Sequence, residues 1–208
     1  MRLLITRPEP DNERTAATLR ALSHEVMLAP LLRIEAIGDA DLGAPPWAAI
    51  LLTSANGARA IAGHPRRGEL MGLPVLAVGE STAIAARAAG FGNVTSADGD
   101  ARDLVRLAVA RFTASSLPLL YLAGEDRTGD LAGELAAQGQ TVRTVVIYRA
   151  AKAPHFPAAA RTATGNTPPM KKAGGPRTAK AATRSTALWL VEAAGKTETA
   201  PRIHCTRS

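Results

Sequence analysis

The amino-acid sequence predicts an α/β protein with parallel sheets, and two observations indicate this class. Short apolar runs such as residues 50–52 lack the polar alternation of a half-exposed strand, so we expect them to be covered on both faces. In addition, a helix end meets a strand start in the same way at three places, which read ALSHEVM, AAGFGNV and AAQGQTV. This joint is typical of a sheet that is wound repeatedly from strand to helix to strand.

The expected helices and strands alternate along the chain. The expected strands cover residues 3–6, 25–29, 31–37, 50–52, 73–78, 93–95, 117–122 and 141–148. The expected helices cover residues 11–22, the end of the stretch 48–61, and residues 83–89, 101–111 and 129–137. A loop rich in glycine and proline over residues 38–46 marks a candidate domain boundary.

Local signals set the ends of the first elements. Pro8 and Pro30 close strands, because proline cannot continue a central strand. Asp11 or Asn12 is the expected cap of the first helix, since short polar side chains at this place accept hydrogen bonds from free helix N–H groups.

Similar signals bound the later helices. Asp100, with Asp103 three residues on, forms a capping-box-like pair at the start of a helix. Gly90 and Gly139 end helices in a turn that glycine adopts easily. Ser23 occupies the corresponding place in the first joint, so it must adopt a less comfortable turn conformation there.

Hydroxyl side chains follow two of the expected strands. Thr53 and Ser54 come directly after residues 50–52, and Ser81 and Thr82 come shortly after a later strand. In open parallel sheets, ligands bind at the carboxyl ends of strands, and free helix N–H groups there suit anions. Thr53 or Ser54 could instead serve only as a helix N-cap, which is a common role at such junctions.

Length and composition limit the classes of protein and of site. The 208 residues allow one large domain or two small ones, and no run approaches the roughly 18 apolar residues that a membrane helix needs. The N-terminus shows no export signal, and the single Cys205 permits no internal disulfide, so a reducing cytoplasm is the expected compartment. The 4 histidines lack ligand spacing, and no dinucleotide fingerprint or P-loop is present. We therefore expect neither a metal nor a cofactor.

The net charge of +7 comes from the C-terminal tail. Residues 1–150 contain 15 Arg, no Lys and 16 acidic side chains, whereas residues 151–208 contain 10 basic and only 2 acidic ones. Only 7 of these 58 tail residues are large and apolar, so we expect the tail to be disordered. The abrupt change in composition leads to the hypothesis that the tail is read from another frame. Resequencing the codons for residues 162–172 and finding a clean frame would remove it.

A set of motifs, taken in order, resembles the uroporphyrinogen-III synthase family. The motifs are LLITRP at residues 3–8, LTSANG at residues 52–57, VGESTA at residues 78–83, GE at residues 124–125 and VIYR at residues 146–149. The resemblance covers about three-quarters of the chain and implies two flavodoxin-like parallel-sheet domains joined by a two-stranded linker. It implies that residues 1–34 start a discontinuous domain one and that residues 35–149 form domain two with its connecting strands. Residues 150–208 then form an atypical basic tail in place of the return to domain one.

The resemblance also implies a reaction. The family cyclises hydroxymethylbilane to uroporphyrinogen III, with inversion of ring D and loss of water, in tetrapyrrole (heme) biosynthesis and without a metal or cofactor. Its substrate carries eight carboxylates, and hydroxymethylbilane synthase is the expected supplier. The resemblance implies a monomer that acts without a membrane or nucleic acid. Whether this chain is active with its atypical tail stays open.

The resemblance assigns roles to particular side chains. The expected substrate-binding residues, at helix starts that line the cleft between the domains, are Thr53, Ser54, Asn56, Ser81 and Thr82, with Arg7 as a partner for a carboxylate. Tyr148 matches the tyrosine that the family places facing this cleft, and as a neutral phenol it could help the substrate's hydroxyl to leave as water. Tyr148 could equally be a packing residue, and Arg7 a solvated one.

A second hypothesis is a non-enzymatic α/β anion-binding or sensor domain with a basic, nucleic-acid-binding tail. The run KKAGGPRTAK at residues 171–180 supplies charge for phosphates, but it lacks aromatic residues and any recognisable module. This hypothesis predicts a retained small anion or nucleotide and binding to RNA or DNA that collapses as salt rises.

Overall fold

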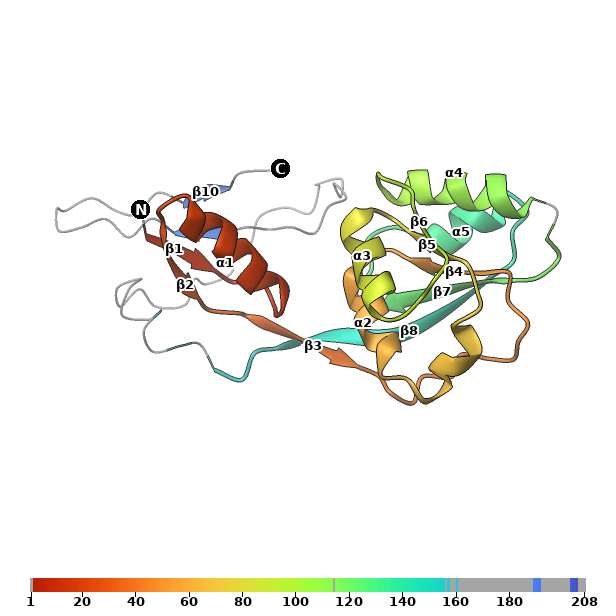
Figure 1. Cartoon of the computed structure of the whole chain (residues 1–208), viewed down its shortest axis with the longest axis horizontal. Helices are drawn as coiled ribbons and strands as arrows, with labels where there is room; N and C mark the ends of the chain where they lie inside the picture. Colours follow the sequence, from red (N-terminus) through yellow and green to blue (C-terminus); the bar gives the residue numbers. More distant parts are fainter. Residues whose placement is uncertain are drawn as a thin grey trace, which may run out of the picture. The chain divides into compact units, whose positions relative to one another are not determined.

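The chain forms two compact units, each of which combines helices with parallel strands. The computed structural model describes residues 2–113, 115–155, 157 and 160, and the backbone of the antiparallel strands β9 (Trp189–Val191) and β10 (Ile203–Cys205). The terminal unit is Met1–Ile34 with Ala151–Ser208, and the middle unit is Glu35–Ala150 (Figure 1). Parallel strand pairs occur in both units, so the predicted α/β class is confirmed. The disorder predicted for the rest of the tail falls on residues outside this description.

A six-stranded sheet organises the middle unit. In order across the sheet, its strands are β3 (Leu32–Ala36), β8 (Val142–Lys152), β7 (Leu119–Gly124), β4 (Ala49–Leu52), β5 (Val75–Ala77) and β6 (Val94–Ser96). The pairs from β8 to β6 are all parallel, so the carboxyl ends of these strands lie at one edge of the sheet. All residues of β4 and β7 are buried, which confirms that apolar runs without alternation mark strands covered on both faces.

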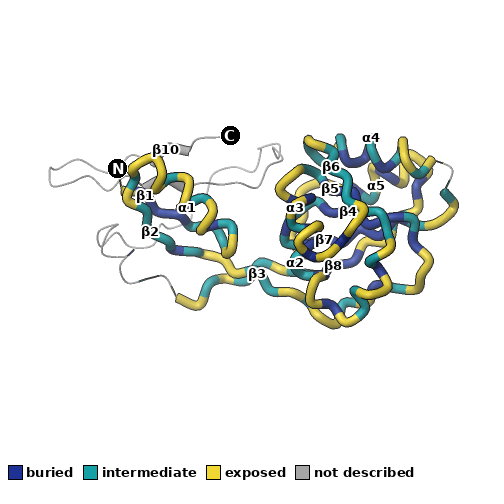
Figure 2. The backbone as a smooth tube through the Cα atoms, in the orientation of Figure 1, coloured by how far each residue is buried: buried dark blue, intermediate teal, exposed yellow. Residues whose placement is uncertain are grey.

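Helices cover both faces of this sheet (Figure 1). One face carries α2 (Ala55–Ala62), the 3₁₀ helix η1 (Pro65–Leu70) and α3 (Glu80–Ala88), and the other carries α4 (Ala101–Phe112) and α5 (Leu131–Ala136). Ile50 and Leu52 belong to the first of the two apolar cores, and Leu51 belongs to the second, because successive strand side chains point to opposite faces. Figure 2 shows the buried backbone concentrated in these central strands.

The predicted capping box at the start of α4 is present. Asp100 accepts from the backbone N–H groups of Arg102 (2.9 Å) and Asp103 (3.3 Å), and Asp103 accepts from the Asp100 N–H (2.8 Å). The bond from the Arg102 N–H, followed by that from the Asp103 N–H, holds the pKa of Asp100 below its usual value, because both favour the charged carboxylate.

The sequence signals do not predict η1, which is a short turn that His64 caps through its bond from the Arg66 N–H (3.1 Å).

The three helix-to-strand joints share one hydrogen-bonded turn. Ser23, Gly90 and Gly139 have positive φ values of 62°, 95° and 79°. In each joint the N–H of this residue donates to the carbonyl three positions earlier, and the next N–H donates to the carbonyl five positions before it. These bonds define a Schellman motif, so the repeated joint seen in the sequence is confirmed. Ser23 holds the left-handed conformation that glycine holds in the other two joints.

The described part of the terminal unit includes a short parallel strand pair and helix α1. Its elements with described side chains are β1 (Arg2–Ile5), α1 (Asp11–Ala21) and β2 (Glu25–Leu28). The prediction that Asp11 or Asn12 caps α1 is wrong, because Pro10 occupies the N-cap position without a side-chain bond. Asn12 is instead fully buried in the first turn, where its Oδ1 accepts from the Glu13 N–H (2.7 Å).

Helix α3 begins earlier than the sequence predicts. The expected start is at Ala83, whereas the helix begins at Glu80. Gly79 is the N-cap in an extended conformation, and its carbonyl accepts from the N–H groups of Thr82 and Ala83, both at 3.0 Å. The early start places Ser81 and Thr82 in the first turn of the helix.

Candidate functional site

The candidate site lies at the edge of the middle-unit sheet where the strands have their carboxyl ends. Thr53 and Ser54 follow β4 directly, and Tyr148 in β8 pairs with Gly124, the last residue of β7. The strands β8, β7, β4 and β5 are neighbours in this order, so the starts of α2 and α3 share this edge. The structure thus places all the predicted site residues except Arg7 in one unit, at one edge of one sheet.

The ring of Tyr148 lies close to the backbone of Gly124, and Gly57 lies near its other edge. A Cβ built on Gly124 would lie 2.6 Å from Cζ of Tyr148 and 2.8 Å from its hydroxyl oxygen, and a Cβ on Gly57 of α2 would lie 3.9 Å from its Cε1. The backbone carbonyl of Tyr148 also accepts from the Glu125 N–H (2.9 Å). The close approach requires glycine at position 124, because any side chain there would displace the half-buried tyrosine.

A β-bulge sets the direction of Tyr148. Ala123 pairs with Val146, and the next pair is Gly124 with Tyr148, so Ile147 is an extra residue in β8. Ile147 is buried in the core on the α2 face, and Tyr148 packs against the same core. In a regular strand these consecutive side chains would point to opposite faces, so the bulge turns Tyr148 toward α2.

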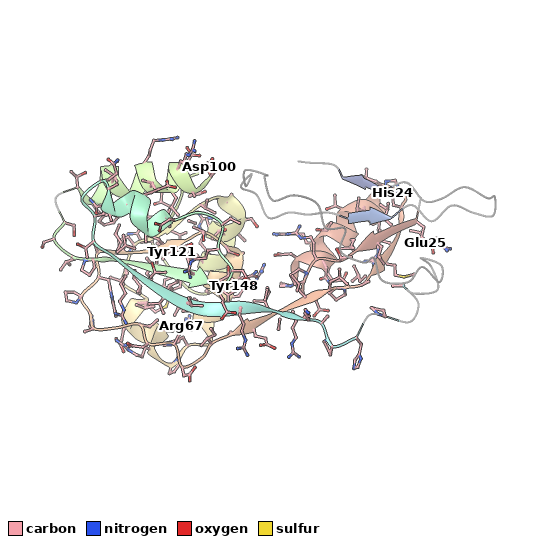
Figure 3. All side chains as sticks on the ribbon, turned by 180° about the vertical axis from the view of Figure 1, so that it is seen from behind. His24, Glu25, Arg67, Asp100, Tyr121 and Tyr148 are labelled. Carbon is pink, nitrogen blue, oxygen red and sulfur yellow. The ribbon has the colours of Figure 1, made fainter. Side chains whose placement is uncertain are left out.

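Thr53 is hydrogen-bonded to a tyrosine that sequence reasoning misses. The hydroxyl of Tyr121 lies 3.0 Å from Oγ1 of Thr53, and either oxygen can donate. Tyr121 is only 5 % exposed, and this burial is the main cause that raises its pKa. The negative charge of a Tyr148 phenolate would raise it further, whereas the Thr53 bond and the Arg127 charge lower it. The available signal was a tyrosine in an otherwise apolar strand, since a buried phenol needs a partner. Figure 3 labels Tyr121 and Tyr148, which come from neighbouring strands.

The start of α2 uses Ser54 as its cap. The Oγ of Ser54 accepts from the Asn56 N–H (3.2 Å), so the capping role considered for this residue is present. The Oδ1 of Asn56 accepts from Nη1 of Arg59 (2.7 Å), which holds a half-buried cation one turn into the helix. Arg59 is a second residue that sequence reasoning misses, and its i,i+3 spacing from Asn56 was the available signal. The first turn of α2 contains no acidic residue that would repel an anion.

Ser81 and Thr82 lie in the first turn of α3, beside the start of α2. The Val78 N–H donates to the Leu52 carbonyl (2.9 Å), so the ends of β5 and β4 are in direct contact. Ser81 is exposed, whereas Thr82 is 5 % exposed. Ser81 is therefore the more accessible of the two residues.

Arg7 belongs to the terminal unit and is tethered to α1. Its Nη1 donates to Oγ1 of Thr15 (3.2 Å), and its Nη2 lies 3.9 Å from a carboxylate oxygen of Asp11. The side chain is 27 % exposed, so it is a partly buried, fixed cation and not a fully solvated one.

The described residues offer neither a metal site nor a membrane span. No group of three or more His, Cys, Asp or Glu side chains in this part of the chain is arranged to hold a metal ion. Among the same residues, no helix combines the length and the apolar character needed to cross a bilayer.

Comparison with known proteins gives one family. The family model described as Uroporphyrinogen-III synthase HemD matches residues 13–169. The chain is similar to the uroporphyrinogen-III synthetase structure from Helicobacter pylori, with 18% identity and a TM-score of 0.47, over 65% of this chain and 59% of that one. It is similar to a mutant uroporphyrinogen III synthase structure from Thermus thermophilus, with 20% identity and a TM-score of 0.46, over 74% and 64%. It thus spans less than two thirds of either structure. No curated protein sequence gives a significant match.

Proposed function

Because the chain belongs to the uroporphyrinogen-III synthase family, whose model matches residues 13–169, we propose that it cyclises hydroxymethylbilane to uroporphyrinogen III. The reaction inverts ring D and releases one water. The observation that supports this function most directly is the Tyr148 ring against Gly124, at the same edge of the sheet as the hydroxyl-bearing starts of α2 and α3. The family match extends past Arg149, where the motifs end, and stops at residue 169, so most of the basic tail lies outside it.

The proposed substrate-binding residues supply hydrogen-bond donors for carboxylates. Thr53, Ser54 and Asn56 act at the start of α2, and Ser81 and Thr82 act at the start of α3, where the helix dipole and free N–H groups favour anions. Arg7 supplies a charge-assisted bond to a further carboxylate. This set fits a substrate with eight carboxylates, because it consists of donors and contains no paired catalytic acids.

Tyr148 is the proposed catalytic residue. Its phenol is an O–H donor and can give its proton to the hydroxyl of the substrate as the carbon–oxygen bond breaks, so that water leaves. The close approach of the ring to Gly124 restricts it, which orients the hydroxyl before the substrate arrives. We propose further that the protein acts as a cytoplasmic monomer that receives hydroxymethylbilane from its synthase and needs no cofactor.

The test is an isomer assay on the purified full chain. Hydroxymethylbilane closes spontaneously to the type I isomer, so formation of the type III isomer measures the enzyme alone. We expect type III product from the wild-type chain and a loss of about 10²-fold or more in its rate for Tyr148→Phe, which keeps the ring and removes the proton donor. Product that is only type I from the folded wild-type chain would rule out the proposed function.

A further inference from the structure

Tyr121 and Thr53 form a pair of hydroxyls that the role of Tyr148 leaves unexplained. Tyr121 lies in β7 and pairs with Leu51 in β4, two residues before Thr53. The two oxygens are 3.0 Å apart. Tyr121 is nearly fully buried, whereas Thr53 is half-buried and lies where β4 ends. The pair therefore connects a buried phenol with a hydroxyl at the edge of the candidate site.

The direction of this hydrogen bond follows from the chemistry of its partners. A phenol is a much stronger acid than an aliphatic alcohol, so it is the better donor of the two. Burial raises the pKa of Tyr121 above its ordinary value of about 10, so the phenol is neutral at pH 7 and carries the proton that it donates. Thr53 is the hydrogen-bond partner that the structure gives to this phenol within the described residues. A buried hydroxyl without a partner is costly, so the Tyr121 proton goes to Oγ1 of Thr53.

The neighbouring hydroxyl is arranged in the same way. Ser54 Oγ accepts from the Asn56 N–H, so Thr53 and Ser54 are both hydrogen-bond acceptors within the protein. Within the described residues no acceptor is given for the proton of either hydroxyl, so each can donate to an acceptor outside the protein. Two consecutive hydroxyls that both donate outward suit a carboxylate, which accepts hydrogen bonds and donates none.

We propose that Tyr121 is a positioning residue, which fixes the hydroxyl of Thr53 as a donor to a substrate carboxylate. This inference rests on the proposed function, because it names the task of one residue in that site. Tyr121 donates to Thr53, and Thr53 donates to the carboxylate, so each bond polarises and strengthens the next. Tyr121 itself does not touch the substrate.

A double-mutant cycle on ligand binding tests the positioning role. The variants are Tyr121→Phe, Thr53→Val and the double variant, each in the full chain, and the probe is uroporphyrin III, a stable porphyrin with the same eight carboxylates. We expect Tyr121→Phe to raise the Kd of the porphyrin and the KM for hydroxymethylbilane by about fivefold to tenfold, as for one lost hydrogen bond, with kcat changed less than about twofold. In the Thr53→Val background, Tyr121→Phe should change neither value, because the hydroxyl that it orients is absent.

Two further variants serve as controls. Thr53→Ser keeps the hydroxyl, so binding should stay sensitive to Tyr121→Phe. Thr95→Val removes another threonine hydroxyl that is bonded in the same unit, to Arg111 at 2.6 Å, and should leave Kd and KM unchanged. Equal effects of Tyr121→Phe with and without the Thr53 hydroxyl would show a packing role and overturn the proposal. The wild-type chain could form only the type I isomer while the binding cycle still shows coupling between Tyr121 and Thr53. In that case the proposed function fails, but the positioning of Thr53 by Tyr121 stands.

Discussion

The ring of Tyr148 lies directly against the backbone of Gly124, so closely that a Cβ at position 124 would be 2.6 Å from Cζ of the tyrosine. Gly124 is the last residue of β7 and is paired with Tyr148 across the bulge. The absence of a side chain at this position therefore lets the tyrosine occupy its place at the edge of the sheet.

Gly124→Ala should displace Tyr148 and disable the proposed reaction. Forcing a methyl group into this contact is expected to cost about 1–3 kcal/mol in the free energy of unfolding and to lower kcat for type III product. Chemical unfolding and the isomer assay measure the two effects. Gly72→Ala is the matched control, because a Cβ there meets nothing within 4 Å. If Gly124→Ala costs as much stability in a Tyr148→Ala background as in the wild type, the contact with the ring is not the cause.

Substitutions of Ser54 should separate its cap from its proposed contact with substrate. Ser54→Ala removes the oxygen that accepts from the Asn56 N–H and is expected to lower the free energy of unfolding by about 1 kcal/mol. Ser54→Asp keeps a cap oxygen but places a negative charge at the site, so it should retain stability and weaken the binding of uroporphyrin III. Unchanged porphyrin affinity in Ser54→Asp would remove Ser54 from the substrate-binding set.

Burial of Tyr121 predicts a loss of stability in alkali. The folded pKa of Tyr121 is raised above the ordinary value of about 10, chiefly by desolvation, so the folded state favours the neutral phenol. At pH values below ~10 the phenol is neutral in both the folded and the unfolded state, so the raised pKa has no effect on stability. As the pH rises from ~10 toward the folded pKa, only the unfolded state ionises readily, so the free energy of unfolding falls. Tyr121→Phe should remove this component of the decline, as measured by unfolding at a series of pH values. A decline of the same steepness in Tyr121→Phe would assign it to other groups.

The serine in the first helix-to-strand joint should be the least favourable of the three turn residues. Ser23→Gly relieves a positive φ that a side chain adopts at a cost, so we expect the free energy of unfolding to rise by up to about 1 kcal/mol. Gly139→Ala makes the reverse change in the same motif, where an added Cβ meets nothing within 4 Å, and should lower it by a similar amount. A destabilised Ser23→Gly would mean that the serine side chain contributes more than its conformation costs.

Much of the fold could be predicted because its signals are local. The apolar runs, the capping box of Asp100 and the three Schellman joints are set by residues close together in sequence, and all are present. The cap of α1 was predicted wrongly for a related reason. Asn12 has the side chain of a good cap, but packing buries it in the first turn, and sequence pattern does not show that competition.

The site was predictable only in part, because its geometry depends on contacts between distant segments. Thr53 and Ser54 could be placed at a strand end from their position in the chain. The bond between Thr53 and Tyr121 joins residues 68 positions apart, and the contact of Tyr148 with Gly124 depends on a register shift between two strands. Neither relationship leaves a mark in the periodicity of the sequence.

The extra residue in β8 has a consequence for how relatives of this chain are aligned with it. Because Ile147 has no pairing partner in β7, the positions before and after it are out of phase with that strand, and a gap placed one column away would exchange the buried Ile147 for Tyr148. Relatives with one residue fewer in this strand would place a different side chain at this position of the proposed site even if every motif matched. To find the residue that corresponds to Tyr148 in a relative, the bulge must therefore be located before the tyrosine is aligned.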